Sequence, residues 1–267
     1  MDTTHILRPS DLSGRPDHAR TDRIRARPTL NKRWLGAVWL VILLAGCQGV
    51  SFPPVANPPA QADSPRLAVG DTWVYRHTDG YTKLPRGTFT HTITAVAGDV
   101  VTMQVKPEDG STVATDRFTR DWNWLDKPMT NIQRFHYDPP YAAFRFPLTV
   151  GKSWSEYTHA TDAASGKTYD LARVDGKVPG WQRVTVPAGA FDAVFVRRAA
   201  YSGAATYERT QEYILEDDWY APAVNNVVAG SYRSIYRDTT QNGEMDDGWR
   251  NNDWTLVELL EYRPARH

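Results

Sequence analysis

Residues 88–95 read Thr88-Phe-Thr-His-Thr-Ile-Thr-Ala95, in which threonine alternates with apolar or aromatic residues. Successive side chains of a β-strand point to opposite faces, so one face of this strand carries threonine and the other faces a core. After a Gly-Asp turn at 98–99, apolar residues alternate in the same way through 101–105. Two such runs joined by a short turn predict a β-hairpin.

Short runs of the same character recur to the end of the chain, and helical periodicity is nearly absent. They are rich in β-branched or aromatic residues and are separated by Gly, Pro and Asp. The sequence therefore predicts an all-β, antiparallel fold with few or no helices. The further runs lie at 182–186, 191–200, 206–216, 231–237 and 254–262.

Two internal similarities indicate two related β-units. Segments 67–73 and 148–154 both read L-x-V-G-x-[ST]-W, a turn glycine followed by a strand that opens with tryptophan, and LPRGTF at 84–89 parallels VPAGAF at 186–191. The spacing differs between the two pairs, so the chain is not a clean tandem repeat. We expect two halves, about 66–120 and 148–264, that form one composite sheet, half-barrel or sandwich. Recurrent turn chemistry without common ancestry is the alternative.

Composition and motifs exclude several classes of function. The 267 residues include 31 basic and 31 acidic ones, so the chain lacks the positive field that nucleic-acid binding usually needs. A single cysteine excludes a disulfide framework, a multi-cysteine zinc site and a CxxC redox motif. No G-x-S-x-G, H-E-x-x-H, Walker or dinucleotide motif occurs. We expect no nucleic-acid partner, no cofactor and a non-enzymatic protein.

The first 46 residues have the organisation of an export signal. Residues 1–33 carry eight basic residues and four aspartates, and residues 34–46 are uncharged. A membrane-spanning helix needs about 20 apolar residues, so this run predicts a signal peptide. A start near Leu30 would leave a compact basic segment, and we interpret 1–29 as a start-site extension. Removal of 1–46 leaves 23 basic and 27 acidic residues.

The segment Leu44-Ala45-Gly46-Cys47 resembles the lipobox of bacterial lipoproteins. The resemblance implies cleavage before Cys47, a diacylglycerol on its thiol and an acyl chain on its amino group, which together anchor a protein to a membrane. In enterobacterial-type lipoproteins Asp in the next position favours the inner membrane, so Gln48 implies the periplasmic face of the outer membrane. An ordinary secretory signal and an uncleaved signal anchor are the alternatives.

Residues 47–65 are expected to be a lipidated tether. Five prolines lie within 51–65, a density that favours an extended, semi-rigid chain. The periplasmic all-β domain is then expected at 66–264.

Three motifs in this domain resemble those of a group of uncharacterised exported bacterial β-domains. They are VPAGAFDAV at 186–194, WYAPAV at 219–224 and LVELLEY at 256–262. Asn225 stands where the group usually has glycine. The resemblance implies an exported β-domain and assigns no catalytic residue.

The segment 121–147 has no sheet period and divides the two halves. We expect a long loop whose aromatic side chains close the core or line a ligand cleft. These side chains are Trp122, Trp124, Phe135, Tyr137 and Tyr141.

A weak calcium candidate lies at 238–249. Oxygen-bearing side chains alternate along it and Gly243 is sixth, as in a calcium loop, but Trp249 stands where a bidentate Glu is needed. We interpret the segment as a solvated hairpin tip, with calcium binding as the alternative. The candidate ligands are Asp238, Asn242, Glu244 and Asp246.

Other polar residues carry less information. His91 lies on the apolar face of its strand, and we interpret it as a hydrogen-bonded core residue. Glu216, Asp217 and Asp218 are adjacent on one strand. Neighbours on a strand point to opposite faces, so this run alone does not supply the spaced carboxylate pair of a glycosidase.

The main hypothesis is a lipid-anchored envelope protein that binds an apolar ligand, such as a lipid, or an envelope protein without catalysis. A glycan-binding or glycan-cleaving module and a structural component of an envelope assembly are the alternatives.

Overall fold

The computed structural model of the chain describes residues 50–111, 113–128, 134–166, 168–206, 209–238 and 248–266. Their secondary structure consists of strands and one short 3-10 helix, η2 (Pro222–Val224). The strands are β1 (Gln61–Ala62), β2 (Thr72–Asp79), β3 (Pro85–Ala97), β4 (Val100–Pro107), β5 (Ala114–Thr119), β6 (Trp124–Pro128), β7 (Arg134–Tyr141), β8 (Leu148–Thr149), β9 (Ser153–Asp162), β10 (Thr168–Val186), β11 (Gly189–Thr206), β12 (Arg209–Ala221), β13 (Asn226–Asp238) and β14 (Arg250–Arg263).

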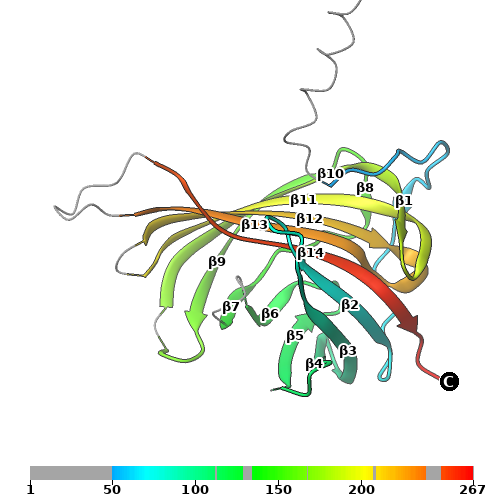
Figure 1. The fold of residues 1–267 in the computed structure, drawn as a ribbon, viewed down its shortest axis with the longest axis horizontal. Coiled ribbons are helices and arrows are strands. Elements are labelled where there is room, and N and C mark those ends of the chain that lie inside the picture. The colour runs from blue at the N-terminus through cyan, green and yellow to red at the C-terminus, as the bar shows by residue number, and fades with distance from the viewer. Residues whose placement is uncertain are drawn as a thin grey trace, which may run out of the picture. The chain divides into compact units, whose positions relative to one another are not determined.

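Twelve of these strands form one closed antiparallel barrel, while β1 and β8 pair separately. The order around the barrel follows the chain from β2 to β7 and from β9 to β14, and β14 then pairs with β2 (Figure 1). The prediction of an all-β antiparallel fold is confirmed. The strands of both expected halves belong to one main sheet, as the composite-sheet alternative predicted. The half-barrel and sandwich alternatives are wrong, because the last strand pairs with the first and leaves no open edge in this sheet.

The hairpin predicted from 88–105 is confirmed as β3 and β4. Ile93 pairs with Met103, and both side chains are buried. Gly98 has a φ of +58° in the turn between the strands, a conformation that glycine adopts without strain. A register shift between Ile93 and Ala95 ends the alternation, so Ala95 is exposed.

The expectation of a long loop at 121–147 is wrong for much of its length, because β6 and β7 lie there and contribute to the barrel wall. Register shifts interrupt the pairing of β6 on both sides. Trp122, just before β6, has a left-handed φ of +59°. These irregularities break the two-residue period, so the sequence pattern did not reveal the strands.

The expected tether also differs in its described part, residues 50–65. Val55 N donates to Trp181 O at 3.1 Å, and Arg183 N donates to Pro53 O at 2.7 Å. Phe52 packs edge-on against Trp219, with 5.1 Å between the ring centroids. This segment is therefore bound along β10 and β12 instead of extending freely, because its apolar side chains cover aromatic rings of the wall.

Asn225, the departure from the usual glycine, closes η2. Its φ of 54° and ψ of 22° are left-handed, and its N–H donates to Pro222 O at 3.2 Å. Asparagine is the residue that most often replaces glycine in this conformation, so the turn is kept.

Two predicted sites fall outside the described residues. They are the lipobox residues Leu44, Ala45, Gly46 and Cys47, and the calcium candidates Asn242, Glu244 and Asp246. Lipidation and calcium binding stay predictions. Within the described residues, no helix has the length and hydropathy needed to span a membrane.

Candidate functional site

A cavity of about 570 Å³ lies inside the barrel, lined by β2–β7 on one side and by β12–β14 on the other. This volume is within the usual range of small-molecule sites. Inward side chains arise from strand alternation: on β12, Ile214, Glu216 and Asp218 line the cavity while Leu215 is exposed. Much of the lining is apolar and includes Phe89, Met103, Val105, Phe118, Phe144 and Val257.

The five predicted cleft residues are all buried, with exposed fractions of 6% or less. Trp122 and Trp124 line the cavity, whereas the other three lie outside its lining. Trp124 stacks on Tyr141 at 4.2 Å between ring centroids. Two of the five residues therefore line the cavity, and the other three pack in the core behind them. The residues behind are Phe135, Tyr137 and Tyr141.

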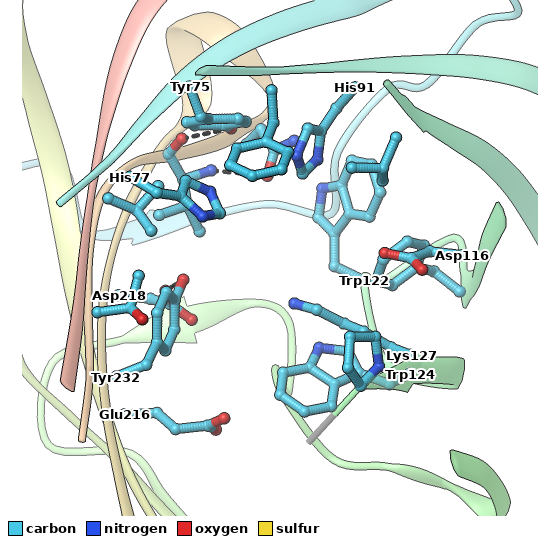
Figure 2. Close-up of a pocket in the computed structure, with 18 of the residues that line it drawn as sticks. Tyr75, His77, His91, Asp116, Trp122, Trp124, Lys127, Glu216, Asp218 and Tyr232 are labelled. Carbon is cyan, nitrogen blue, oxygen red and sulfur yellow. Dashed lines mark hydrogen bonds between the residues drawn. The ribbon is translucent and has the colours of Figure 1, made fainter. Parts of the chain in front are cut away.

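Two histidines, His77 and His91, face the cavity from neighbouring strands (Figure 2). Burial, with the positive charges of Lys127 and Arg86, lowers the pKa of His77 to about 4. Burial, with contributions from His77 and Lys127, lowers the pKa of His91 to about 3. Both rings are therefore neutral at pH 7. The interpretation of His91 as a hydrogen-bonded core residue is wrong for its Nε2, which is buried without a hydrogen-bond partner.

The His91 pKa predicts a loss of stability in acid. A histidine in the unfolded chain has a pKa of about 6.5, so between that pH and about 3 the unfolded chain binds more protons and stability falls as the pH falls. The His91→Phe variant keeps a ring against Tyr75 and takes no proton. From pH 7 to pH 5, the unfolding free energy of the variant should fall by about 1–2 kcal/mol less than that of the wild type. Urea denaturation at both pH values measures the two decreases. Equal losses in both proteins would contradict the lowered pKa.

Lys127 of β6 brings a cation into the cavity. Its Nζ lies 4.3 Å from the centroid of the Trp124 ring and 5.9 Å from that of Phe118. Figure 2 shows the side chain directed toward the space between the two walls. Ring faces stabilise an ammonium group by about 0.5–2 kcal/mol, but they do not neutralise its charge.

The opposite wall carries a buried charge cluster centred on Arg198, whose side chain has an exposed fraction of 0%. Arg198 Nε donates to Glu216 Oε2 at 2.8 Å, and Nη2 donates to Asp218 Oδ2 at 2.5 Å. Tyr141 OH donates to Glu216, and Tyr232 OH donates to Asp218. Burial alone would lower the pKa of Arg198, but the charges of Asp218 and Glu216 raise it well above its usual value.

The 216–218 run follows the expected alternation. Asp217 lies on the outer face and pairs with Arg197, whereas Glu216 and Asp218 face inward. Each inward carboxylate is held by Arg198 and one tyrosine. Oxygens of both carboxylates are already engaged by these donors, so the pair is better suited to structure than to proton transfer.

No group of three or more His, Cys, Asp or Glu side chains suited to a metal ion occurs among the described residues. Asp238, the described member of the calcium candidate, lies 3.4 Å from Arg250 in an ion pair.

Three residues of this region were missed by sequence reasoning, namely His77, Lys127 and Arg198. His77 and Lys127 reach the same cavity only because β2 and β6 belong to one barrel. Arg198 meets its acidic partners through the pairing of β11 with β12. The only available signal was Lys127 itself, a cation within an aromatic-rich segment.

No protein-family model matches the chain, and a search of curated proteins found no match. Among solved structures, the chain is similar to the hypothetical lipoprotein YmcC from Escherichia coli. The TM-score is 0.41, with 9% identity over 74% of this chain and 86% of that one. A protein with a YmcC-like fold from Bacteroides fragilis has a TM-score of 0.44 and 12% identity over 76% of this chain and 100% of that one. Similarity at this level carries no argument, so function is inferred from the residues of this chain.

Proposed function

We propose that the protein binds a small, largely apolar ligand inside its barrel, without converting it, as a lipid-anchored component of the bacterial envelope. The observation that carries this proposal is the cavity of about 570 Å³ and its lining. Aromatic and aliphatic side chains around a few convergent polar groups are typical of small-molecule sites. Transfer of apolar ligand surface from water to this lining supplies the driving force.

The anchor is proposed from the lipobox resemblance at Leu44–Cys47. After cleavage, Cys47 would be the first residue and would carry the acyl chains that hold the protein at the periplasmic face of the outer membrane. Only Gln48 and Gly49 separate it from the segment beginning at Val50, part of which is bound along the barrel wall. Few residues would therefore separate the acylated cysteine from the part of the chain that is bound to the barrel wall.

Ligand binding can be tested with a protein of residues 50–267, which form a compact unit containing the whole barrel. Val105 lines the cavity, and its neighbour Gln104 is exposed on the same strand. A Val105→Trp variant should fill part of the cavity and lower the affinity for the neutral apolar dye Nile red at least tenfold. Gln104→Trp should leave it unchanged. Fluorescence titration measures both affinities, and thermal unfolding verifies that both variants are folded.

Native mass spectrometry of the same protein, purified without detergent, gives the second readout. A bound lipid or other apolar molecule supports the proposal. Absence of dye binding in the wild type, or equal binding in folded Val105→Trp, overturns it. In that event, retention on peptidoglycan or an oligosaccharide would favour the glycan-binding module, and retention on neither would favour a structural role.

A further inference from the structure

Resting on the proposed function, we infer that the ligand is an amphipathic anion, with an apolar body and one acidic oxygen group that pairs with Lys127. The acidic group is a carboxylate or a phosphate, since both offer the same charged oxygens to an ammonium donor.

The first support is that the acidic residues lining the cavity already have cationic partners. Asp116 pairs with Arg134, and Asp253 pairs with Arg86. Glu216 and Asp218 share Arg198. Within the described part of the lining, each carboxylate therefore has a guanidinium partner before any ligand enters.

The second support is that the unpartnered polar atoms of the described cavity lining are nitrogens. Lys127 Nζ has no carboxylate or hydrogen-bond acceptor among the described residues, and the neighbouring residues 129–133 contain no Asp or Glu. Arg233 donates through Nη2 to Asn251 at 2.8 Å, but its buried Nε has no partner. His91 Nε2 is unpartnered as well. Lys127 Nζ and Arg233 Nε can only donate, and the Nε2 of a neutral His91 donates in one of its two tautomers, so one acceptor group suits all three.

Charge separates the two walls. On the β12–β14 side, the three carboxylates of Glu216, Asp218 and Asp253 outnumber the two guanidiniums of Arg198 and Arg233, and Tyr232 donates to Asp218. On the opposite side, Lys127 lies over Trp124, and its positive charge contributes to the lowered pKa values of His77 and His91. An anionic group is therefore favoured beside Lys127 and disfavoured beside the acidic wall (Figure 2). A cationic ligand would be repelled by Lys127, whose ammonium already lies over the rings of Trp124 and Phe118.

The apolar body has its own surface. Phe118 and Trp124, the two rings beneath the ammonium of Lys127, lie in one lining with Met103 and Val105 of β4. A chain attached to the acidic group can thus leave the ammonium and continue over apolar side chains. An aliphatic acid or an alkyl phosphate has this combination of parts.

The test compares head groups on one chain length. Lauric acid, dodecyl phosphate and dodecanol are each used to displace Nile red from residues 50–267, from Lys127→Met and from Lys106→Met, whose lysine is exposed on β4. We expect the wild type to bind at least one of the two anions at least tenfold more tightly than dodecanol. Lys127→Met should lose that preference but still bind dodecanol, and Lys106→Met should keep the preference. A Lys127→Arg variant, which retains the positive charge, should keep most of it.

The outcomes separate this inference from the function on which it rests. Equal affinity of the wild type for the alcohol and both anions, or an unchanged preference in Lys127→Met, overturns the anionic ligand and leaves apolar binding intact. Failure of all three compounds and of the dye to bind overturns both. Tighter binding of laurate than of dodecyl phosphate assigns a carboxylate ligand, and the reverse order assigns a phosphate.

Discussion

Replacement of Arg198 by methionine should lower the free energy of unfolding by about 3–5 kcal/mol, the cost of leaving buried charges without their partner. Arg198 is fully buried and binds Glu216, Asp218 and the carbonyl oxygen of Ala143. Methionine keeps a long apolar side chain against Phe144 but donates no hydrogen bond. Two carboxylates would then share a buried site without a counter-charge. Urea denaturation at pH 7 measures the loss.

The adjacent Arg197 provides a matched control. It also pairs with an acidic residue of β12, through two hydrogen bonds to Asp217 of 2.6 and 2.8 Å, but its side chain is 46% exposed. Arg197→Met should cost less than about 1 kcal/mol, because exposed ion pairs contribute little. Similar losses in the two variants would contradict the assignment of the large effect to buried charge.

A triple variant distinguishes lost charge pairing from lost packing. Glu216→Gln and Asp218→Asn, added to Arg198→Met, remove the unpaired charges and keep oxygen acceptors for Tyr141 and Tyr232. The triple variant should recover a substantial part of the stability, because the remaining groups are neutral. If it is as unstable as Arg198→Met alone, packing dominates.

Replacement of Cys47 by serine should move the full chain from the membrane fraction to the soluble fraction of the cell. The proposed thiol and amino acyl chains contribute about 0.8 kcal/mol for each buried CH₂, and stable anchoring needs at least two such attachments. Fractionation followed by immunoblotting measures the distribution. Metabolic labelling with an alkyne analogue of palmitate should mark the wild type and leave Cys47→Ser unlabelled, since the chain has no other cysteine.

Gln48→Ala serves as the control for this experiment, because it changes the next residue and keeps the cysteine. It should remain labelled and membrane-bound. Persistence of Cys47→Ser in the membrane fraction would instead favour an uncleaved signal anchor. A soluble, unlabelled wild type would favour an ordinary secretory signal.

Much of the strand content could be predicted because alternation is local. The Thr/apolar pattern around Phe89 and Ile93 located β3, and the paired tryptophans Trp73 and Trp154 located the starts of β2 and β9. β6 and β7 escaped prediction because register shifts and the left-handed Trp122 break the period over a short length. Segment 50–65 was misjudged because its prolines suggested a free, extended chain and gave no sign of the aromatic surface that Phe52 covers.

The candidate site was predicted in part. Trp122 and Trp124 were identified because a dense aromatic segment must either pack or bind. His91 was placed correctly on the inward face, but alternation cannot tell whether that face meets another side chain or a cavity. Lys127 and Arg198 were not identified, since nothing near either residue in the sequence indicates its environment in the barrel.

The sequence by itself determined that this protein is built from antiparallel strands, because side-chain alternation and turn residues act within a few neighbouring positions. The tertiary structure alone decided that β14 pairs with β2, which closes the sheet and encloses a cavity. It also decided that Lys127 faces that cavity with no carboxylate partner among the described residues, whereas Arg198 has two. These outcomes depend on register and pairing between segments far apart in the chain, and a local pattern carries no information about such distant partners.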